Sequence, residues 1–474
     1  MTIANDIISC RVPDFDYYLR EGESLDDIDE YGFTLLIETV ITRQAKIAKL
    51  LIDRKVDINK PDVTGRTALH WAVDNADLEM VKLLLHNGAN PNAYTSSGLS
   101  VLVYPILRQQ NDIKHLLYQY NAKLDFALDF IYTKLLGHRF ELKGDVDIVT
   151  AEGEFIELDY EGFILEFTVA VIKDSLRRFT SSYSTRHFRS QYKYVHVIMD
   201  AFGIADELLQ LQHHVDLKKE QLIRLKQLIE APQLILPAAS RGHAICFVKH
   251  NDWLAKIDRG ENSLHEGSIN IYKITKPKAF DLAFIQDFLY KKQPREYFHK
   301  KINHILGLEK VQYIPISSQI VGNCSWANVQ AAVLVGYALQ KISEDGKLDY
   351  NEALTIYDDW VEWDKDRALD ESIQRFYLAN DARKASIASV LGAILFHVCD
   401  DSSSLHIARA EKILTILTLP ECYYILQSYL DIYCVKRLTK KGNNLLKILD
   451  DCGVNPNIDV NPIATGLDPR DNER

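Results

Sequence analysis

The chain has 474 residues, of which 47% are hydrophobic and 26% are charged, and its formal net charge is −11. This length is sufficient for two or three domains with separate cores, and the composition is typical of a globular protein rather than a fibrous or disordered one. The negative charge argues against broad binding to nucleic acids or to membranes, because phosphate groups attract basic surfaces.

A repeat dominates the first quarter of the chain. Gly32, Gly65 and Gly98 recur every 33 residues, and each is followed two residues later by a threonine or a serine. The middle copy, GRTALHWAVDNADLEMVKLLLHNGANPNA, has the pattern of an ankyrin repeat. The hydroxyl side chain caps the first helix of each copy, and a glycine such as Gly88 ends the second helix. We therefore predict an ankyrin solenoid of about four units over residues 1–136, with atypical first and last units.

A short loop connects each repeat to the next, and we expect the tips of these loops to be exposed. Similar ankyrin stacks bind other proteins through such tips and through the concave helix face. The candidate partner-binding residues are Tyr31, Val63, Thr64, Arg66, Tyr94, Thr95, Ser96 and Ser97.

From about Phe140 the pattern changes to short strands alternating with helices, which indicates an α+β domain over residues 137–342. The fold class that we predict is thus multidomain α+β. The strands expected here, apart from a hairpin, are 154–158, 162–168, 270–275 and 312–316, with helices near 203–230 and 279–306.

The hairpin within this domain brings two chemically interesting residues together. Residues 243–249 and 252–258 read as strands joined at His250 and Asn251. A two-residue loop at that point places His243 directly opposite Asp258, with their Cβ atoms about 5 Å apart. That spacing allows a carboxylate to hold the imidazole in one tautomer. The same alternation puts Cys246 on the opposite face, as a core residue.

A cysteine follows a Gly-Asn turn further along, in the run Gly-Asn-Cys324-Ser-Trp, and enters a predicted helix over residues 326–339. A helix N-terminus and a neighbouring imidazolium both stabilise a thiolate. Gln319 lies five residues earlier and offers an amide donor for an oxyanion. We predict that Cys324 is a nucleophile with His243 as its base and Asp258 as the orienting acid; Asn262 is an alternative to Asp258.

The chain after residue 343 is almost wholly helical, and we assign residues 343–460 to a third domain. Near its end, a leucine-rich helix leads into Gly453-Val-Asn-Pro-Asn, which echoes Gly88-Ala-Asn-Pro-Asn of the ankyrin repeats. Two similar helix terminators would explain this echo, but we favour an ankyrin-like helical unit. Residues 461–474 are polar and are expected to form a disordered tail.

The remaining features concern compartment and cofactors. The seven cysteines are odd in number and lack Cys-x-x-Cys spacing, which favours reduced thiols in a cytosol-like compartment. The N-terminus lacks a secretory signal pattern, and the longest apolar run, 385–398, is too short to span a bilayer. No phosphate-binding loop or metal-ligand cluster is present in the sequence, so we expect no cofactor and no metal.

The order His243, Asp258, Gln319, Cys324 resembles that of the ubiquitin-like-protein protease and adenovirus-protease superfamily, which includes bacterial deubiquitinase and acetyltransferase effectors. The resemblance implies that these residues serve as base, orienting acid, oxyanion donor and nucleophile. The chain departs from that pattern at two places. Ala244 follows the histidine where the superfamily usually has tryptophan, and Asn323-Cys324-Ser325 stands where the superfamily usually has Asp-Cys-Gly. The Cys-Ser-Trp run is more similar to that of papain, although the cysteine of papain comes first in the chain.

Taken as a whole, the chain resembles the ankyrin-repeat effectors that Legionella delivers into host cells by type IV secretion. The resemblance implies a protein that acts in the host cytosol on a host protein recognised by the ankyrin stack. We also expect a monomer, with the nucleus as an alternative place of action. Two functions remain open. In the first, the chain is a cysteine protease or deubiquitinase-like hydrolase, or an acyltransferase that uses the same residues. In the second, it is a non-catalytic adaptor with a protease-shaped binding module.

Overall fold

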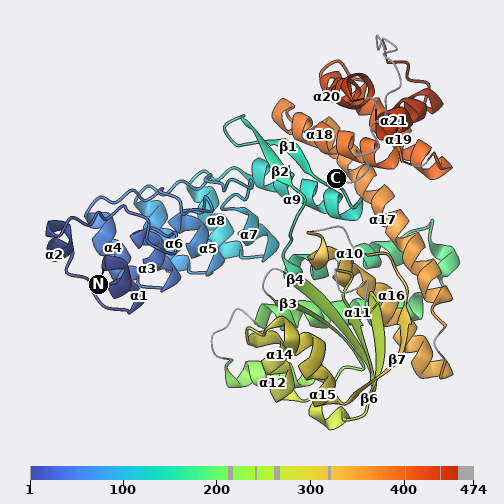
Figure 1. Cartoon of the computed structure of the whole chain (residues 1–474), viewed down its shortest axis with the longest axis horizontal. Coiled ribbons are helices and arrows are strands. Elements are labelled where there is room, and N and C mark those ends of the chain that lie inside the picture. The colour runs from blue at the N-terminus through green and yellow to red at the C-terminus, as the bar shows by residue number, and fades with distance from the viewer. Residues whose placement is uncertain are drawn as a thin grey trace. The chain divides into compact units, whose positions relative to one another are not determined.

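In the computed structural model the chain forms two compact units, Met1–Ala368 and Leu369–Arg474 (Figure 1). The residues that the structure describes are 2–211, 217–240, 243–260, 267–318, 322–347, 349–400, 402–437 and 439–456.

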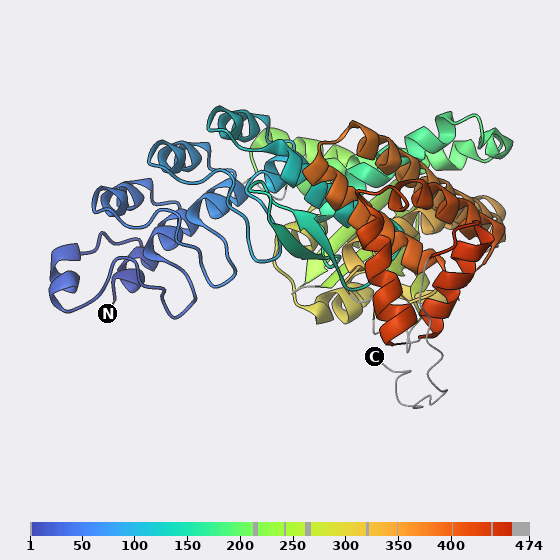
Figure 2. The same ribbon diagram turned by 90° about the horizontal axis from the view of Figure 1, so that it is seen from above.

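The first unit opens with the predicted ankyrin repeats, which are confirmed as helix pairs that follow one another from the N-terminus (Figure 2). The Thr34 hydroxyl accepts a hydrogen bond from the backbone of the first helical turn, and Thr67 and His70 form a capping box. The helices are α1 (Ile3–Ile8), α2 (Phe15–Arg20), α3 (Leu35–Ile41), α4 (Ala45–Asp53), α5 (Ala68–Asp74), α6 (Leu78–His86), α7 (Val103–Leu107) and α8 (Asn111–Gln119).

The glycines that mark the repeat are required by the loops between the helix pairs. Gly32 has a φ of +88°, and its carbonyl accepts a hydrogen bond of 3.1 Å from the Val63 amide of the next loop. A Cβ atom at Gly32 would lie 2.6 Å from a Val63 methyl group. Neighbouring loops therefore stack closely, and a side chain at this position would force them apart.

Two strands and a long helix follow the repeats. Helix α9 (Leu124–Arg139) leads into an antiparallel pair, β1 (Asp145–Val149) and β2 (Phe155–Asp159). The strand predicted over 162–168 is wrong, because helix α10 (Leu165–Ser181) begins there. Its buried residues Val169, Ile172 and Leu176 continue the pattern at helical spacing, which a window of seven residues is too short to reveal.

The centre of the first unit is a five-stranded antiparallel sheet in which every strand pairs with its sequence neighbour. The first strand is not among the predicted strands. It contains Pro237 and lies at the edge of the sheet, where proline is tolerated. The strands are β3 (Gln233–Ser240), β4 (His243–His250), β5 (Trp253–Ile257), β6 (Ile269–Ile274) and β7 (Leu308–Ile314).

Helices cover both faces of this sheet. One face buries Leu236, Phe247 and Leu254 against helices α12, α14 and α15. The other face packs against α16 (Cys324–Asp345), which contacts β4 and β5 and begins with the candidate nucleophile. The remaining helices of this region are η1 (Arg186–Phe188), α11 (Tyr192–Leu211), α12 (Lys219–Ile229), η2 (Pro277–Ala279), α14 (Leu282–Tyr290), the π-helical η3 (Tyr297–Lys301) and α15 (Ile302–Leu306).

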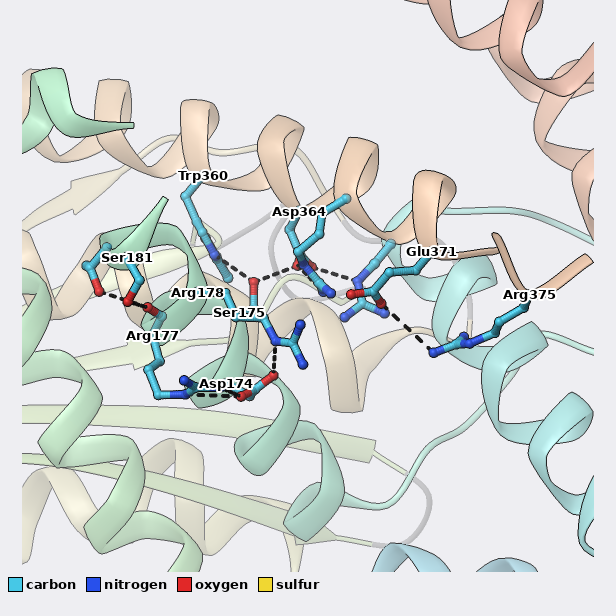
Figure 3. A network of polar contacts seen from close by, with 12 residues as sticks. Asp174, Ser175, Arg177, Arg178, Ser181, Trp360, Asp364, Glu371 and Arg375 are labelled. Carbon is cyan, nitrogen blue, oxygen red and sulfur yellow. Dashed lines mark hydrogen bonds and ion pairs between the residues drawn. The ribbon is translucent and has the colours of Figure 1, made fainter. Parts of the chain in front are cut away.

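A buried polar network joins three helices of the first unit (Figure 3). Asp364, on α17 (Asn351–Leu378), accepts hydrogen bonds from Arg139 of α9 and Ser175 of α10, both at 2.6 Å. The indole of Trp360 donates to Ser175 at 3.0 Å. A buried carboxylate needs such partners, because an unpaired charge away from water is strongly unfavourable.

The second unit is helical, as predicted. Its buried side chains include Leu391, Leu417 and Leu449. Its resemblance to ankyrin repeats and the predicted domain limits stay predictions, and the tail 461–474 lies outside the described residues. The elements after α17 are α18 (Asp381–Val398), α19 (Ser404–Leu417), α20 (Tyr423–Leu430), the π-helical η4 (Asp431–Lys436) and α21 (Lys440–Asp451).

Candidate active site

Cys324 is the first residue of α16, and its side chain is half-buried. The turn before it requires glycine, since Gly322 has a φ of +81° and a Cβ there would lie within 3 Å of the Glu161 side chain. The amide of Gly162 donates to the Gly322 carbonyl at 2.9 Å, so the loop after β2 supports the nucleophile turn. In the structure the helix begins at Cys324, two residues before the predicted start at residue 326. The sulfur therefore lies directly at the helix N-terminus.

His243 lies at the start of β4 and joins the other two predicted residues. Its Nε2 atom is 3.0 Å from Oδ1 of Asp258, and its side chain lies close enough to the Cys324 thiol for the two groups to shift each other's pKa. Because Nε2 faces the carboxylate, Nδ1 is the nitrogen available to the sulfur. The backbone amide of Ala244 donates to the same sulfur at 3.3 Å. The structure thus brings Cys324, His243 and Asp258 together.

The register of the hairpin differs from the prediction by two residues. The loop is formed by Asn251 and Asp252, because Asn251 adopts a left-handed conformation with a φ of +52°, and His250 pairs with Trp253. In this register His243 and Asp258 are diagonal neighbours rather than directly opposite. A shift of two residues keeps every side chain on its face, so the predicted contact still forms.

Electrostatics in this cluster favour the thiolate–imidazolium form. Hydrogen bonds with Asp258 and with Cys324 raise the pKa of His243 to about 9. Burial acts to raise the pKa of Cys324, but the hydrogen bonds from His243 and Ala244 and the imidazolium charge outweigh it and hold that pKa below its usual value. Burial likewise opposes ionisation of Asp258, whose pKa is nevertheless lowered by the hydrogen bond and the charge of His243.

The other thiols have different surroundings. Cys246 is buried on the face opposite His243, as predicted, and burial strongly raises its pKa. Burial also raises the pKa of Cys399, Cys422, Cys434 and Cys452. Cys324 is therefore the cysteine whose surroundings lower its pKa.

Asn328 is a supporting residue that sequence reasoning missed. It lies one helical turn after Cys324 and is fully buried. Its amide group donates to the Ala244 carbonyl at 2.7 Å, and its oxygen accepts from the Arg259 amide at 2.9 Å. It thereby ties the nucleophile helix to the strands that carry the histidine and the aspartate. The signal that could have found it is an asparagine flanked by the apolar residues Ala327 and Val329 in the first turns of the predicted helix.

Two predicted residues cannot be placed. Gln319, the proposed oxyanion donor, and Asn262, the alternative orienting residue, lie outside the described residues. The two tryptophans near the site in sequence do not cover the thiol. Trp326 is buried, with its ring stacked on His138, and Trp253 lies at the opposite end of β5 from Asp258.

The predicted partner-binding residues of the first two ankyrin loops are mostly exposed. Tyr31 is 59% exposed and Val63 is 71% exposed, and Thr64 beside it is also exposed. Arg66 is different, because it lies over the Trp71 ring at 5.0 Å and donates to the Tyr104 hydroxyl at 3.2 Å. It contributes to the stack itself.

The third loop is divided in the same way. Ser96 and Ser97 are exposed, whereas Thr95 is buried and accepts a hydrogen bond from the Leu99 amide. The Tyr94 ring packs edge-on against Phe126 of α9 at 5.5 Å. The surface available to a partner on this loop is therefore its two serines.

Among the described residues, no group of three or more histidine, cysteine or acidic side chains is arranged to hold a metal ion. In the same residues, no helix combines the length and apolar character needed to cross a bilayer.

Comparison with known proteins agrees with the repeat pattern. The ankyrin-repeat family matches residues 11–95 in three copies. An ankyrin repeat protein of Rickettsia bellii is 33% identical over 116 residues, which are 23% of this chain and 33% of that protein. The mouse B-cell lymphoma 3 protein homolog is 44% identical over 72 residues, or 15% of this chain and 16% of that protein. The chain thus spans a third or less of these relatives.

A solved structure extends the likeness to the whole chain. The Legionella effector AnkH is 69% identical, with a TM-score of 0.78, over 98% of this chain and 100% of that one. The predicted resemblance to Legionella ankyrin-repeat effectors is confirmed by this match. The chain belongs to the family of the Legionella effector AnkH.

Proposed function

We propose that the protein is an effector that acts inside a host cell, where its ankyrin stack binds a host protein and Cys324 carries out hydrolysis or acyl transfer on that protein. Type IV secretion is the delivery route that we infer, with the host cytosol as the place of action. The observation that carries the chemical proposal is the position of His243, which lies 3.0 Å from Asp258 and interacts with the Cys324 thiol closely enough for the two groups to shift each other's pKa.

The geometry supports a covalent mechanism in which each residue has one task. Cys324 transfers its proton to His243, and the resulting thiolate attacks a substrate carbonyl carbon. The tetrahedral intermediate collapses as His243 returns the proton to the leaving amine, which leaves a thioester on Cys324. His243 then deprotonates an incoming water, whose attack releases the acid and restores the thiol. Asp258 orients the imidazole throughout and stabilises its charged form.

The same thioester serves acyl transfer if an amine replaces the water in the second step. Gln319 and the Cys324 backbone amide are the donors that we propose for the oxyanion. The substrate class, whether a peptide bond, a ubiquitin-like conjugate or an acyl donor, depends on loops rather than on this core of residues.

A second function follows from the ankyrin region. The exposed Tyr31 and Val63 lie on successive loops, where they are available to a protein partner. Cys324 is half-buried, with the Ala244 amide already on its sulfur. In this alternative the chain is an adaptor, and its protease-like region contributes shape but no turnover.

Labelling of the full chain distinguishes the two. Iodoacetamide tests whether the thiol is activated, and ubiquitin vinyl sulfone tests whether the cleft accepts a ubiquitin-like tail; Cys324→Ala is the control for both. Labelling by both reagents at Cys324 supports a deubiquitinase-like hydrolase. Labelling by iodoacetamide alone supports an activated thiol with another substrate class. If neither reagent prefers Cys324 to the remaining cysteines, the adaptor function is the correct one.

A further inference from the structure

The Asp258 carboxylate faces two imidazoles rather than one. Its Oδ1 atom accepts from His243 Nε2 at 3.0 Å and from the Gly260 amide at 3.2 Å. Its Oδ2 atom lies 3.6 Å from Nε2 of His299. Within the described part of the chain this buried oxygen has no hydrogen bond. The polar group that faces it is the ring of His299.

An irregular piece of helix delivers His299 to this position. The residue lies in the π-helical turn η3, whose neighbours Tyr297 and Phe298 are buried in the core beneath the sheet. Single π-helical turns are rare and occur frequently at functional sites, because the extra residue redirects a side chain. The sequence pattern indicates only a helix in this region.

Lys256 determines which nitrogen of His299 carries the proton. It lies on β5 two residues before Asp258, hence on the same face of the sheet, and only 3% of it is exposed. Its Nζ atom is 2.5 Å from Nδ1 of His299. A lysine ammonium donates hydrogen bonds and accepts none. We therefore assign Nδ1 as the acceptor and place a proton on Nε2, which faces the carboxylate.

We propose that Lys256 and His299 form a positioning pair, which holds the Asp258 carboxylate anionic and in one rotamer and through it orients His243 toward Cys324. This inference rests on the proposed function of Cys324 as an activated nucleophile. The polar groups are arranged in one direction: the Lys256 ammonium is directed at Nδ1 of His299, and Nε2 of His299 faces Oδ2 of Asp258 at 3.6 Å. An N–H dipole at each carboxylate oxygen opposes rotation of the group, which would otherwise withdraw Oδ1 from His243.

The charged and titratable groups around the carboxylate come from several elements. His243 is on β4, Lys256 on β5, His299 on η3 and Cys324 on α16. Arg259 follows Asp258 in sequence, but its guanidinium is directed elsewhere, to the Ser317 carbonyl at 2.9 Å and toward Glu141 at 3.6 Å. The neighbour that we assign to Oδ2 is thus the imidazole and not the guanidinium.

The test compares substitutions at His299 in the full chain. His299→Leu removes the N–H donor, and His299→Gln keeps an amide N–H that can reach the carboxylate. The double variant Lys256→Met with His299→Leu avoids a buried lysine that has lost a partner, and so guards against a folding defect. The readout is the rate of Cys324 alkylation by iodoacetamide between pH 5 and 10, followed by mass spectrometry, with circular dichroism to verify the fold.

We expect the parent to alkylate fastest at Cys324 at neutral pH. His299→Leu and the double variant should react about threefold to tenfold more slowly, because the carboxylate loses the polar group that faces Oδ2. The dependence of their alkylation rate on pH should move toward that of an ordinary thiol. His299→Gln should recover most of the rate. If folded His299→Leu keeps the parent's rate and profile, or if the Gln and Leu variants lose equally, the positioning pair is wrong while the proposed function stands. A parent whose Cys324 is no more reactive than Cys10 would overturn both.

Discussion

His138 stacks on Trp326, with ring centroids 6.0 Å apart and planes inclined by 7°. His138 belongs to α9, the helix that closes the ankyrin stack, and Trp326 lies two residues after Cys324. Arg139 adds a cation–π contact to the same indole at 5.3 Å. The repeat stack and the nucleophile helix therefore share a packed contact, although the exposed loop tips are remote from it in the chain.

This contact predicts a measurable dependence of stability on pH. Burial, and the positive charge of Lys134, lower the pKa of His138 to about 4. Since a histidine in the unfolded chain titrates near 6.5, only the unfolded state binds this proton between about pH 6.5 and 4. The contribution of His138 to stability is thus complete above that range and is lost as pH falls through about 4.

His138→Phe keeps a ring against Trp326 and removes the titration. As pH falls from about 6.5 to 4, the free energy of unfolding of the variant should decrease less steeply than that of the parent. The two slopes should differ by about 1.4 kcal/mol per pH unit, which is the contribution of one proton. Urea unfolding at several pH values measures the slope. Equal slopes for the two proteins would mean that His138 becomes protonated in the folded state.

Cys324 should react faster with iodoacetamide at neutral pH than any other cysteine of the native chain. Its thiolate forms as pH rises through a pKa that lies below the usual value, and the His243 imidazolium persists up to about pH 9. At pH 7 the rate should therefore be a larger fraction of its plateau than it is for ordinary thiols, which have a pKa of about 8.5 and are mostly protonated there. Peptide mapping after brief alkylation checks this; preferential labelling of Cys10 would contradict it.

Asp258→Asn should reduce the reactivity of Cys324 less than His243→Ala does. The asparagine oxygen can still accept from His243, but without the anion the pKa of the imidazole should fall from about 9 toward 6.5. His243→Ala removes the base altogether. Asp252→Asn, at the other end of β5, is the matched control because that carboxylate is exposed. The assigned geometry is wrong if Asp258→Asn and Asp252→Asn both alkylate as fast as the parent.

Tyr31→Ala and Val63→Ala should each weaken capture of a host partner with little loss of stability. Both side chains are mostly exposed, so each change should alter the unfolding free energy by about 0.5 kcal/mol or less. A pull-down from host-cell lysate compares them with Lys49→Ala, an exposed change on the outer helix α4, and with Cys324→Ala. If Cys324→Ala loses its partners while both loop variants keep theirs, recognition instead takes place at the Cys324 site.

Asp364→Asn should destabilise the first unit strongly. Its carboxylate is buried and pairs with Arg139 at 2.6 Å, so the substitution leaves a buried guanidinium without its counter-ion, at a cost of about 3–5 kcal/mol. Asp174→Asn is the control shown beside it in Figure 3, because Asp174 pairs with Arg177 and Arg178 at the surface. That change should cost about 1 kcal/mol or less. Similar midpoints of denaturation for the two variants would contradict the assigned burial.

The features that the sequence determined by itself depend on repeated or local patterns of residues. The ankyrin repeat follows from glycines that recur every 33 residues, since each copy carries its own caps and apolar face. The proximity of His243 and Asp258 follows from alternation in a hairpin, which survives a register error of two residues. The placement of Cys324 at a helix start follows from the Gly-Asn turn before it.

Only the tertiary structure decided which distant side chains support these residues. Asn328 hydrogen-bonds to the backbone of Ala244 and of Arg259. His299 faces Asp258 from a π-helical turn, and His138 stacks on Trp326. Each is an ordinary residue in a helical pattern, because local periodicity records which face of a helix is buried and not what that face meets. Contacts between residues 40 to 190 positions apart depend on how whole elements pack, and packing is a property of the assembled core.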